Sequence, residues 1–454
     1  REINKYGWYH ELSSLLGWKL FLLLKKYTND YILKKIKKEN IMIKNEYEIL
    51  KQAEKVVLAY SGGLDTSVIV KWLRENSVKE VICVSVDLGQ VENPKALEEK
   101  ALSSGASKFY NINVEDEFIE DYAFKSLKAG AKYENVYLLG TAIARPLISK
   151  VLVDIAKKEG AEVIVHGCTG KGNDQIRFEL SMMALAPEIK VIAPWRFWDI
   201  KGRSEEEAYA KEHGIPLKVE KDEDYSMDEN IWHLSHEGLD LEDPASPANL
   251  EKILKWVTPA EKAIDKAETI EIEFEKGKPV ALNGENLEGS DLVKKLNELA
   301  GKHGIGVDDI VESRMVGMKS RGVYENPAAS VLYFAHEKLE SVTVHPDALQ
   351  YKQKMALDYA NLVYAGKWMT PLKEAMDSFI EKTQENVSGT VKVKLYKGSM
   401  QPAGIYATNS LYSEEYATFE EDDVYDQSDA TGFINLFGLS TKMYAKAVKE
   451  SEKN

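Results

Sequence analysis

The first half of the chain alternates short apolar segments with stretches of helical periodicity. Residues Val56–Tyr60 form an apolar run that ends in Ser-Gly-Gly, and the spacing of apolar positions over 66–74 predicts a helix directly after it. The alternation continues with predicted strands at 81–87, 108–112 and 163–166 and predicted helices at 94–103 and 145–158. This order predicts βαβ units, right-handed crossovers and a parallel sheet. Such sheets bind ligands at the carboxyl ends of their strands.

The pattern changes in the second half of the chain. Prolines 216, 244 and 247 interrupt a region of short polar segments. Beyond it, residues 269–274 and 391–396 alternate apolar and polar positions, which predicts strands with one solvated face. Residues 440–449 have a helical pattern. We therefore expect an N-terminal extension (1–52), an α/β domain (53–218), an α+β domain (219–435) and a C-terminal helical tail (436–454).

The N-terminal extension differs in composition from the rest. Residues 1–41 carry nine Lys or Arg against four Asp or Glu, a balance of +5, whereas the whole chain has a net charge of −15. The apolar run at 15–24 is too short to span a bilayer and contains Lys19. Because Met42 stands just before the globular pattern, we expect residues 1–41 to lie outside the functional fold. The alternative is a basic amphipathic segment that lies on a membrane surface.

The net charge and the cysteine content limit which binding partners and which cellular location we expect. The net charge of −15 disfavours a broad surface for a nucleic-acid backbone, and we expect neither nucleic acid nor membrane as a partner. Cys83 and Cys168 have no CxxC partner and no metal-ligand spacing, which fits a reduced, cytoplasmic location. His233 and His236 are three residues apart and could share a helix face, but no HExxH occurs, so we predict no protein-bound metal centre.

The loop that follows the first predicted strand has the composition of an anion site. In Ser61–Ser67 (SGGLDTS), the glycines allow backbone N–H groups to approach a phosphate, and the following helix adds unpaired donors and positive partial charge. Asp65 could cap the helix or hold Mg²⁺ that accompanies the phosphate. The structural alternative is a tight Gly-Gly turn. The loop lacks the Lys of a Walker A motif and is not GxGxxG.

The same loop has the SGGxD(S/T) form of the PP-loop. PP-loop enzymes bind the pyrophosphate portion of ATP and cleave it between the α- and β-phosphates, so this resemblance implies adenylyl transfer. A second Gly-rich loop, 166–175 (HGCTGKGNDQ), follows a later strand and precedes Arg177. Loops of this kind bind polar ligands through backbone and amide groups, and the alternative is a solvated turn.

Six segments taken together resemble the argininosuccinate synthase family. They are AYSGGLDTS (59–67), YLLGTAIARP (137–146), HGCTGKGNDQIRFE (166–179), IKVIAPWR (189–196), YSMDENIWHLSHEG (225–238) and VESRMVGMKSRGVYENPA (311–328). The resemblance runs from about Lys55 to the C-terminus. It implies an α/β fold with a parallel-sheet PP-loop (adenine nucleotide alpha hydrolase-like) ATP-binding domain, an α+β synthetase domain and a helical oligomerisation tail.

The family's activity is then what we expect of the chain. Members condense L-citrulline with L-aspartate in arginine biosynthesis, using ATP and Mg²⁺ and releasing AMP and diphosphate by way of a citrullyl-adenylate. They are usually cytosolic homotetramers. No general base for the aspartate amine is evident, and our hypothesis is that a phosphate oxygen of the adenylate accepts its proton.

The resemblance also assigns residues. The ATP site falls on Ala59, Tyr60, Ser61, Gly62, Gly63, Leu64, Asp65, Thr66 and Ser67, with Val86 near the adenine and Gly167 near the ribose or phosphates. Aspartate falls on Thr169, Asn173 and Asp174. Citrulline falls on Tyr137, Asn173, Arg177, Ser226, Ser235, Glu312 and Tyr324. Of these, we expect Ser61, Asp65, Asn173 and Asp174 to act in catalysis.

One position departs from the family pattern. Members often carry a citrulline-binding Ser where this chain has Ala142, and we expect Thr141 or a backbone group to take its place. The rival functions are another PP-loop ligase fed with ammonia from glutamine, a tRNA-modifying PP-loop enzyme and a nucleotide-binding sensor. No nucleophilic Cys near the start supports the first, the charge disfavours the second, and a sensor would not need the second loop.

Overall fold

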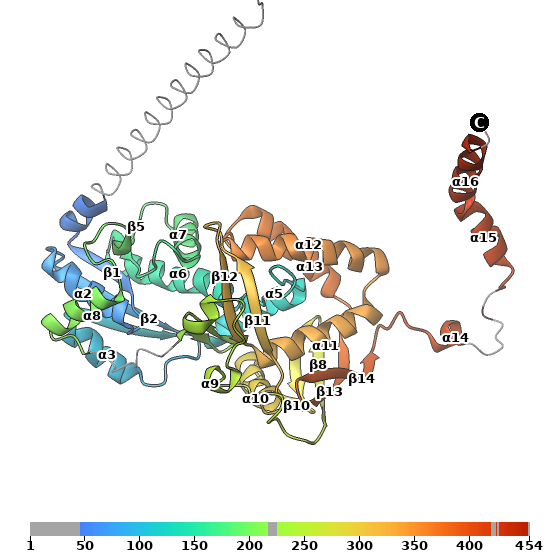
Figure 1. The fold of residues 1–454 in the computed structure, drawn as a ribbon, viewed down its shortest axis with the longest axis horizontal. Helices are drawn as coiled ribbons and strands as arrows, with labels where there is room; N and C mark the ends of the chain where they lie inside the picture. The colour runs from blue at the N-terminus through green and yellow to red at the C-terminus, as the bar shows by residue number, and fades with distance from the viewer. Residues whose placement is uncertain (1–45, 217–224, 419–423, 425, 453–454) are drawn as a thin grey trace, which may run out of the picture.

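The computed structural model describes residues 46–216, 225–418, 424 and 426–452. The expectations for residues 1–41 lie outside the described residues, and so does the expected boundary between 218 and 219. Figure 1 shows an α/β body, a second body of sheets and helices beside it, and a C-terminal tail that stands clear of both.

The first half is built on a five-stranded parallel sheet, and the alternating pattern predicted a parallel sheet and four of these strands but not the one at Lys190–Ile192. Its strands follow the order β3-β2-β1-β4-β5. They are β1 (Lys55–Ala59), β2 (Glu80–Asp87), β3 (Lys108–Asn113), β4 (Val163–Val165) and β5 (Lys190–Ile192). The long helices of this half are α2 (Leu64–Glu75), α3 (Pro94–Ser103), α6 (Gly140–Glu159), α7 (Asp174–Leu185) and α8 (Arg203–Glu212).

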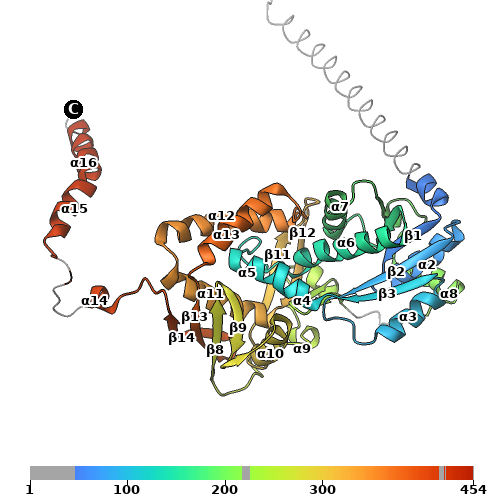
Figure 2. The same ribbon diagram turned by 180° about the vertical axis from the view of Figure 1, so that it is seen from behind.

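Successive residues of the strands face opposite layers of helices. Val57 and Ile82 belong to the core cluster that contains α6, whereas Val56 and Leu58 pack with α2. Both faces of the sheet are therefore covered, which explains why these strands are continuous apolar runs. Figure 2 shows the same layers from behind, with α3 and α8 on the side opposite α6 and α7.

Helix α6 begins earlier than its sequence predicted. We expected it over 145–158, directly around Pro146. The helix begins at Gly140, directly after Leu139 with a φ of 64°, and so Pro146 lies inside it. Almost every residue of this first part is buried, and that burial offsets the unfavourable interior proline.

The second half contains two antiparallel sheets. One has the order β10-β9-β8-β13-β14 and includes both predicted period-two strands, β8 (Glu268–Glu275) and β13 (Gly389–Tyr396). Its other strands are β9 (Lys278–Leu282), β10 (Glu285–Asn286) and β14 (Ser399–Ala407). The other sheet has the order β11-β12-β7-β6 and consists of β6 (Ser226–Asn230), β7 (His233–Glu237), β11 (Val307–Ser313) and β12 (Lys319–Glu325).

The expectation that His233 and His236 share a helix face was wrong. Both lie on β7, where residues three apart face opposite sides of the sheet. His236 pairs with the buried Glu325 at 2.7 Å, whereas His233 faces the first half of the chain. The short segment between Asn230 and His233 forms a hairpin instead of a helix.

Helices cover the sheets of the second half. The long ones are α10 (Gly289–Lys302), α11 (Pro327–Thr343), α12 (Pro346–Tyr364) and α13 (Pro371–Gln384). The first half contributes the shorter elements α4 (Glu115–Glu117), the π-helix η1 (Phe118–Ala123), α5 (Phe124–Ala129) and η2 (Pro194–Arg196). The second half contributes η3 (Leu239–Glu242) and α9 (Leu250–Ile253). One core cluster runs from the parallel sheet through these helices to β8 and β13, so the two halves share apolar packing.

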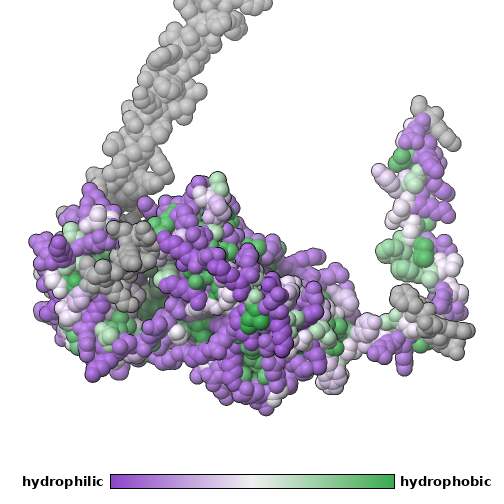
Figure 3. Space-filling model, turned by 60° about the horizontal axis from the view of Figure 1, so that its bottom comes forward, coloured by the Kyte–Doolittle hydropathy of each residue, from purple (hydrophilic) through white to green (hydrophobic). Residues whose placement is uncertain are grey.

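The C-terminal tail is helical, as its pattern predicted. The predicted helix at 440–449 lies in α16 (Leu439–Ser451), and it is preceded by α14 (Glu414–Ala417) and α15 (Asp429–Phe437), which were not predicted; the three helices together are called the tail. None of the described residues of these helices is buried, and Phe437 and Tyr444 are 78% and 74% exposed. Figure 3 shows hydrophobic side chains on the surface of the tail beyond the body. Among the described residues, no helix is long and apolar enough to cross a membrane.

Candidate functional site

The two Gly-rich loops meet at the carboxyl edge of the parallel sheet. They follow β1 and β4, which are neighbours in the sheet, with Leu58 opposite Val165. A Cβ at Gly167 would lie 3.3 Å from the side chain of Thr66 and 3.8 Å from that of Asp65. The absence of a side chain at Gly167 therefore lets the second loop pack against the first turn of α2. The edge of the sheet predicted to bind a ligand is thus formed by both loops.

The first loop is held by its own hydroxyl groups. Ser67 Oγ donates to the Gly63 carbonyl at 2.8 Å, and the Gly63 amide donates to Ser61 Oγ at 3.3 Å. Gly62 has a φ of +77°, and a Cβ there would lie 2.2 Å from Leu97 Cδ1. Lys100 Nζ donates to the Gly62 carbonyl at 2.6 Å. These contacts hold the loop in a tight turn, and the N-terminal turn of α2 lies directly where the loop ends.

Asp65 lies within the first turn of α2 and does not cap the helix. The N-cap residue is Gly63, which has no side chain to accept the first amides. The amides of residues 64–66 thus have no partner within the helix and suit an anion. The buried Glu206 of α8 lies beside Asp65. Burial raises the pKa of Glu206 to about 9. A hydrogen bond to Asp65 and the negative charge of Asp65 act in the same direction. Glu206 is therefore a protonated donor to Asp65 at neutral pH.

His166 anchors the second loop. Its Nδ1 accepts the amide of Cys168 at 3.2 Å, and its Nε2 lies 3.3 Å from Glu179. This pattern fixes the proton on Nε2 and leaves no lone pair on the ring for a substrate. Arg196 also binds Glu179. The ring is buried and stacks on Phe178. His166 therefore supports the loop and is not placed to act as a base.

Asp174 stands at the start of α7 between two guanidinium groups. Arg145 donates to its Oδ2 through Nε at 2.9 Å and Nη2 at 2.8 Å, and Arg177 donates to its Oδ1 at 2.8 Å. Burial opposes ionisation of this carboxyl, but the two positive charges prevail and lower its pKa to about 2. Arg145 also binds Asp228 of β6 at 2.6 Å. Asp174 is thus a fixed, permanently ionised group.

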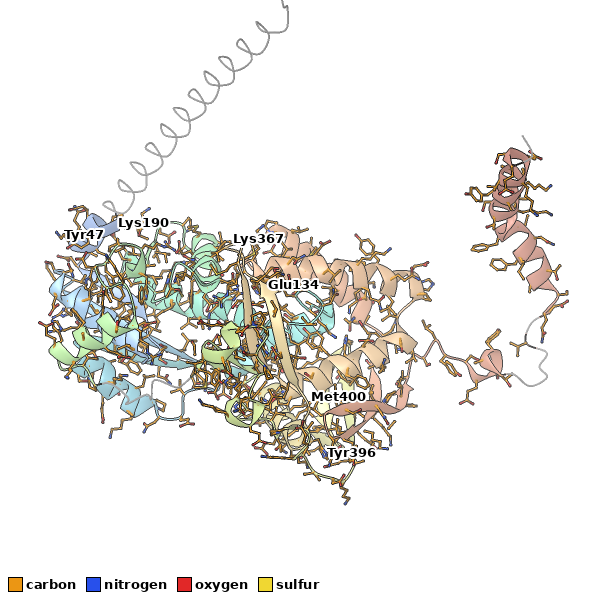
Figure 4. All side chains as sticks on the ribbon, viewed as in Figure 1. Tyr47, Glu134, Lys190, Lys367, Tyr396 and Met400 are labelled. Atoms are coloured by element: carbon orange, nitrogen blue, oxygen red, sulfur yellow. The ribbon has the colours of Figure 1, made fainter. Side chains whose placement is uncertain are left out.

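Asn173 links the second loop to the other half of the chain. Its Nδ2 donates to the hydroxyl of Tyr364 at 2.8 Å, and its Oδ1 accepts the amide of Met315 at 2.8 Å. Met315 lies in the turn of the β11–β12 hairpin. Close by, Glu134 accepts the amide of Ser313 at 3.2 Å, and Figure 4 shows Glu134 beside this hairpin. One N–H of the Asn173 amide is left for a ligand.

Tyr137, just before α6 in the first half, and Tyr324, on β12 in the second half, lie together at one side of the site. Their rings are 5.0 Å apart, and the Tyr137 hydroxyl accepts the amide of Thr141 at 3.0 Å. Thr141 Oγ1 lies 2.9 Å from Nε2 of His233, whose pKa burial lowers to about 4. Ala142 is fully buried and has no hydroxyl to offer a ligand. Thr141 therefore offers the hydroxyl nearest to the position where the family often has Ser.

The remaining predicted residues differ in how deeply they lie. Ser235 and Glu312 are buried on strands β7 and β11, and Ser235 pairs with Tyr324 across the sheet. Ser226 begins β6 and is exposed. Val86 is buried near the end of β2, and Thr169 is exposed on the second loop.

Glu312, unlike Asp174, has no ion pair with a cationic side chain among the described residues. Its Oε2 is buried and has no hydrogen-bond partner there. Burial raises its pKa to about 7, although the charge of Arg177 and the hydroxyl of Tyr364, acting as a donor, oppose that rise. A buried carboxylate with a free oxygen is a suitable partner for a ligand ammonium group.

Sequence reasoning missed Arg145, Asp228, His233 and Tyr364 in this site, and also Glu206, which lies outside all six segments. The first three lie inside segments that carried the family resemblance. The presence of charged or ring side chains in those segments could have indicated them as site residues. Tyr364 lies outside all six segments, and its sequence position gave no signal. Among the described residues, no group of three or more His, Cys, Asp or Glu side chains could hold a metal ion.

Comparisons with known proteins agree with this arrangement. Residues 55–216 match the model of the arginosuccinate synthase N-terminal HUP domain, and residues 225–444 match that of the arginosuccinate synthase C-terminal domain. The chain is 58% identical to the argininosuccinate synthase of Carboxydothermus hydrogenoformans over 401 residues, which cover 88% of this chain and 100% of that protein. It is 55% identical to the argininosuccinate synthase of Acetivibrio thermocellus over 404 residues, covering 89% and 100% of the two chains.

Proposed function

Because the chain belongs to the argininosuccinate synthase family, we propose that it joins L-citrulline to L-aspartate at the expense of ATP, in arginine biosynthesis. The products are argininosuccinate, AMP and diphosphate. The observation that carries the proposal is the meeting of the PP-loop with the 166–175 loop at one edge of the sheet, facing Glu312 and Arg177. This arrangement provides one anion site and two sites for amino acids.

ATP is assigned to the first loop. The unpaired amides of α2, with the hydroxyls of Ser61 and Thr66, suit the diphosphate that leaves. Asp65 would hold the Mg²⁺ that accompanies ATP, and its carboxylate is oriented by Glu206. The ATP set consists of Ala59, Tyr60, Ser61, Gly62, Gly63, Leu64, Asp65, Thr66, Ser67, Val86 and Gly167.

Aspartate is assigned to Thr169, Asn173 and Asp174. Two guanidinium groups occupy three of the roughly four lone-pair directions of the Asp174 carboxylate, which leaves one on Oδ1 for the substrate ammonium. The exposed hydroxyl of Thr169 and the remaining N–H of Asn173 would then bind carboxylates of the same substrate.

Citrulline is assigned to the deeper end of the site. The free oxygen of Glu312 suits its ammonium group. The guanidinium of Arg177 suits a carboxylate. Thr141 supplies a hydroxyl beside Tyr137. The full set consists of Tyr137, Thr141, Asn173, Arg177, Ser226, Ser235, Glu312 and Tyr324.

The reaction then has two steps. The ureido oxygen of citrulline attacks the α-phosphorus of ATP, and diphosphate leaves. The amine of aspartate attacks the activated ureido carbon, and AMP leaves. Asp174, with a pKa of about 2, is too weak a base to take the proton of the amine, and His166 has no free lone pair. Our hypothesis remains that a phosphate oxygen of the adenylate accepts the proton. The residues themselves act by holding three reactants in line.

The remaining assignments concern the whole chain. We assign the nucleotide domain to 53–218, the synthetase domain to 219–435 and the oligomerisation tail to 436–454, with α15 beginning before that last boundary. The exposed apolar side chains of the tail suit a homotetramer. Two free cysteines and the net charge of −15 suit a cytoplasmic enzyme that binds neither nucleic acid nor membrane.

An isotope experiment tests the reaction directly. Citrulline labelled with ¹⁸O in the ureido group is incubated with ATP, Mg²⁺, aspartate and the protein. We expect AMP to form only when both amino acids are present, and the label to appear in the phosphate of AMP. AMP without label would exclude the citrullyl-adenylate, and AMP formed without aspartate or citrulline would favour a different ligase.

A further inference from the structure

Tyr364, the last residue of α12, contacts the site through three different groups. Its hydroxyl accepts Nδ2 of Asn173 at 2.8 Å, and its carbonyl accepts Nε of Arg177 at 2.9 Å. The guanidinium of Arg177 lies over its ring, 4.7 Å from the centroid. The hydroxyl also lies near enough to Glu312 to favour the ionised form of that carboxyl and so to lower its pKa. A single residue from the second half of the chain therefore contacts groups assigned to both amino acids.

The Tyr364 side chain is itself held firmly. It is fully buried, and its ring stacks on that of Tyr133 with centroids 3.5 Å apart. The ring of Tyr137 meets it edge-on, with the centroids 6.2 Å apart. A tyrosine fixed on two sides has one direction for its hydroxyl. Because the hydroxyl accepts from Asn173, its single proton is available to the Glu312 carboxylate.

We infer that Tyr364 is the positioning residue that prepares Glu312 and Asn173 for citrulline. This inference rests on the proposed function. The hydroxyl orients the Asn173 amide so that its second N–H faces the substrates, and it stabilises the ionised form of Glu312. Without the hydroxyl, one N–H of Asn173 loses its acceptor and Glu312 loses a donor. Both losses weaken the binding of a ligand ammonium group.

The charged groups around Glu312 determine how large this effect is. Arg177 of α7 and Arg314 of the β11–β12 turn favour the ionised carboxylate, whereas Glu237 of β7 disfavours it. Arg314 is paired with Glu237 at 2.6 Å, so much of its charge is already compensated. Tyr364 is thus one of the few groups that favour ionisation of Glu312, and its loss moves the pKa upward.

The test compares two Tyr→Phe changes on one helix. Tyr364→Phe keeps the ring and the carbonyl but removes the hydroxyl. Tyr359→Phe is the matched control, because Tyr359 is also fully buried on α12 and its hydroxyl donates to a carboxylate, that of Asp377, at 3.0 Å. The KM for citrulline and kcat are measured across pH for the wild-type chain and both variants, and citrulline binding is measured by calorimetry.

We expect Tyr364→Phe to raise the KM for citrulline about tenfold or more at neutral pH, because a hydrogen bond to a charged group is lost. The midpoint of its pH dependence should move to higher pH, and Tyr359→Phe should keep the wild-type profile. An unchanged KM and midpoint in Tyr364→Phe would overturn the inference, as would an equal shift in Tyr359→Phe. A wild-type chain that binds citrulline but forms no AMP would instead overturn the proposed function.

Discussion

At the scale of single residues, the carboxyl groups of the site differ in their pKa values because their surroundings differ. Asp174 lies between two guanidinium groups and keeps its charge at any ordinary pH. Glu312 is buried with only partial compensation, and its pKa rises to about 7. Glu206 is buried beside Asp65 and is protonated. These differences divide their roles: Asp174 is a permanent anion, Glu312 titrates near neutrality, and Glu206 donates a hydrogen bond.

The pKa of Glu312 predicts a pH dependence for citrulline. In the proposed assignment, the ammonium group of citrulline binds the ionised carboxylate of Glu312, which is the minor form below the pKa and the major form above it. The KM for citrulline should therefore fall as the pH rises through about 7. Steady-state rates at varied citrulline and pH would show it. Glu312→Gln should have a high KM with no such dependence, and a dependence that persists in this variant would contradict the assignment.

Asp65 and Asp174 should differ in what their loss affects. Asp65→Ala should reduce ATP-dependent diphosphate release by orders of magnitude with the fold intact, as circular dichroism would verify.

Asp174→Ala should raise the KM for aspartate before that for citrulline. It should also lower the melting temperature, because the positive charges of Arg145 and Arg177 lose a partly buried counter-ion. Near-normal diphosphate release in the first variant, or a defect confined to citrulline in the second, would refute these roles.

At the scale of elements, close packing between α6 and β7 places the Thr141 hydroxyl. Thr141 is in the first turn of α6, and His233 begins β7. The two elements approach closely because Gly140 has no side chain. A Cβ at Gly140 would lie 2.3 Å from the His233 ring.

Gly140→Ala should therefore damage both packing and citrulline binding. The new methyl group must displace the His233 ring, and overpacking of this kind costs about 1–3 kcal/mol. Chemical denaturation would give the loss of stability, and the KM for citrulline would give the effect on Thr141. Gly202→Ala is the control, since a Cβ there meets nothing within 4 Å. Equal effects of the two changes would argue against a role for this contact.

At the scale of the whole molecule, the tail stands out because its apolar side chains have no cover within the described chain. Phe433, Leu436 and Phe437 are 62%, 78% and 78% exposed. Exposed apolar surface of this kind marks an association site. A second copy of the chain is the partner that fits the proposed homotetramer.

Changes in the tail should thus alter assembly before they alter chemistry. Phe433→Ser combined with Phe437→Ser should reduce the mass measured by light scattering below that of a tetramer. Lys442→Ser, on the same tail, should leave the mass unchanged. A double variant that keeps the wild-type mass would show that the tail does not hold the assembly together.

The sequence by itself determined the features that depend on neighbours in the chain. Alternating apolar runs and Gly-rich turns indicated the parallel sheet and both loops, because strand, turn and helix patterns are local. Period-two alternation likewise indicated β8 and β13. The start of α6 and the hairpin that carries His233 were not predicted, since burial against distant segments overrode the local signals at Pro146 and at the histidine pair.

The tertiary structure decided which groups meet. Tyr364 contacts Asn173 and Arg177, which are 191 and 187 residues away in the sequence, and Arg145 joins Asp174 to Asp228 from three separate elements. Neither the spacing of residues nor the composition of the sequence indicates these contacts, because they depend on how the parallel sheet, the antiparallel sheets and the helices pack together. The raised pKa of Glu312 and the lowered pKa of Asp174 arise only there, since both depend on burial and on charges brought close by the fold.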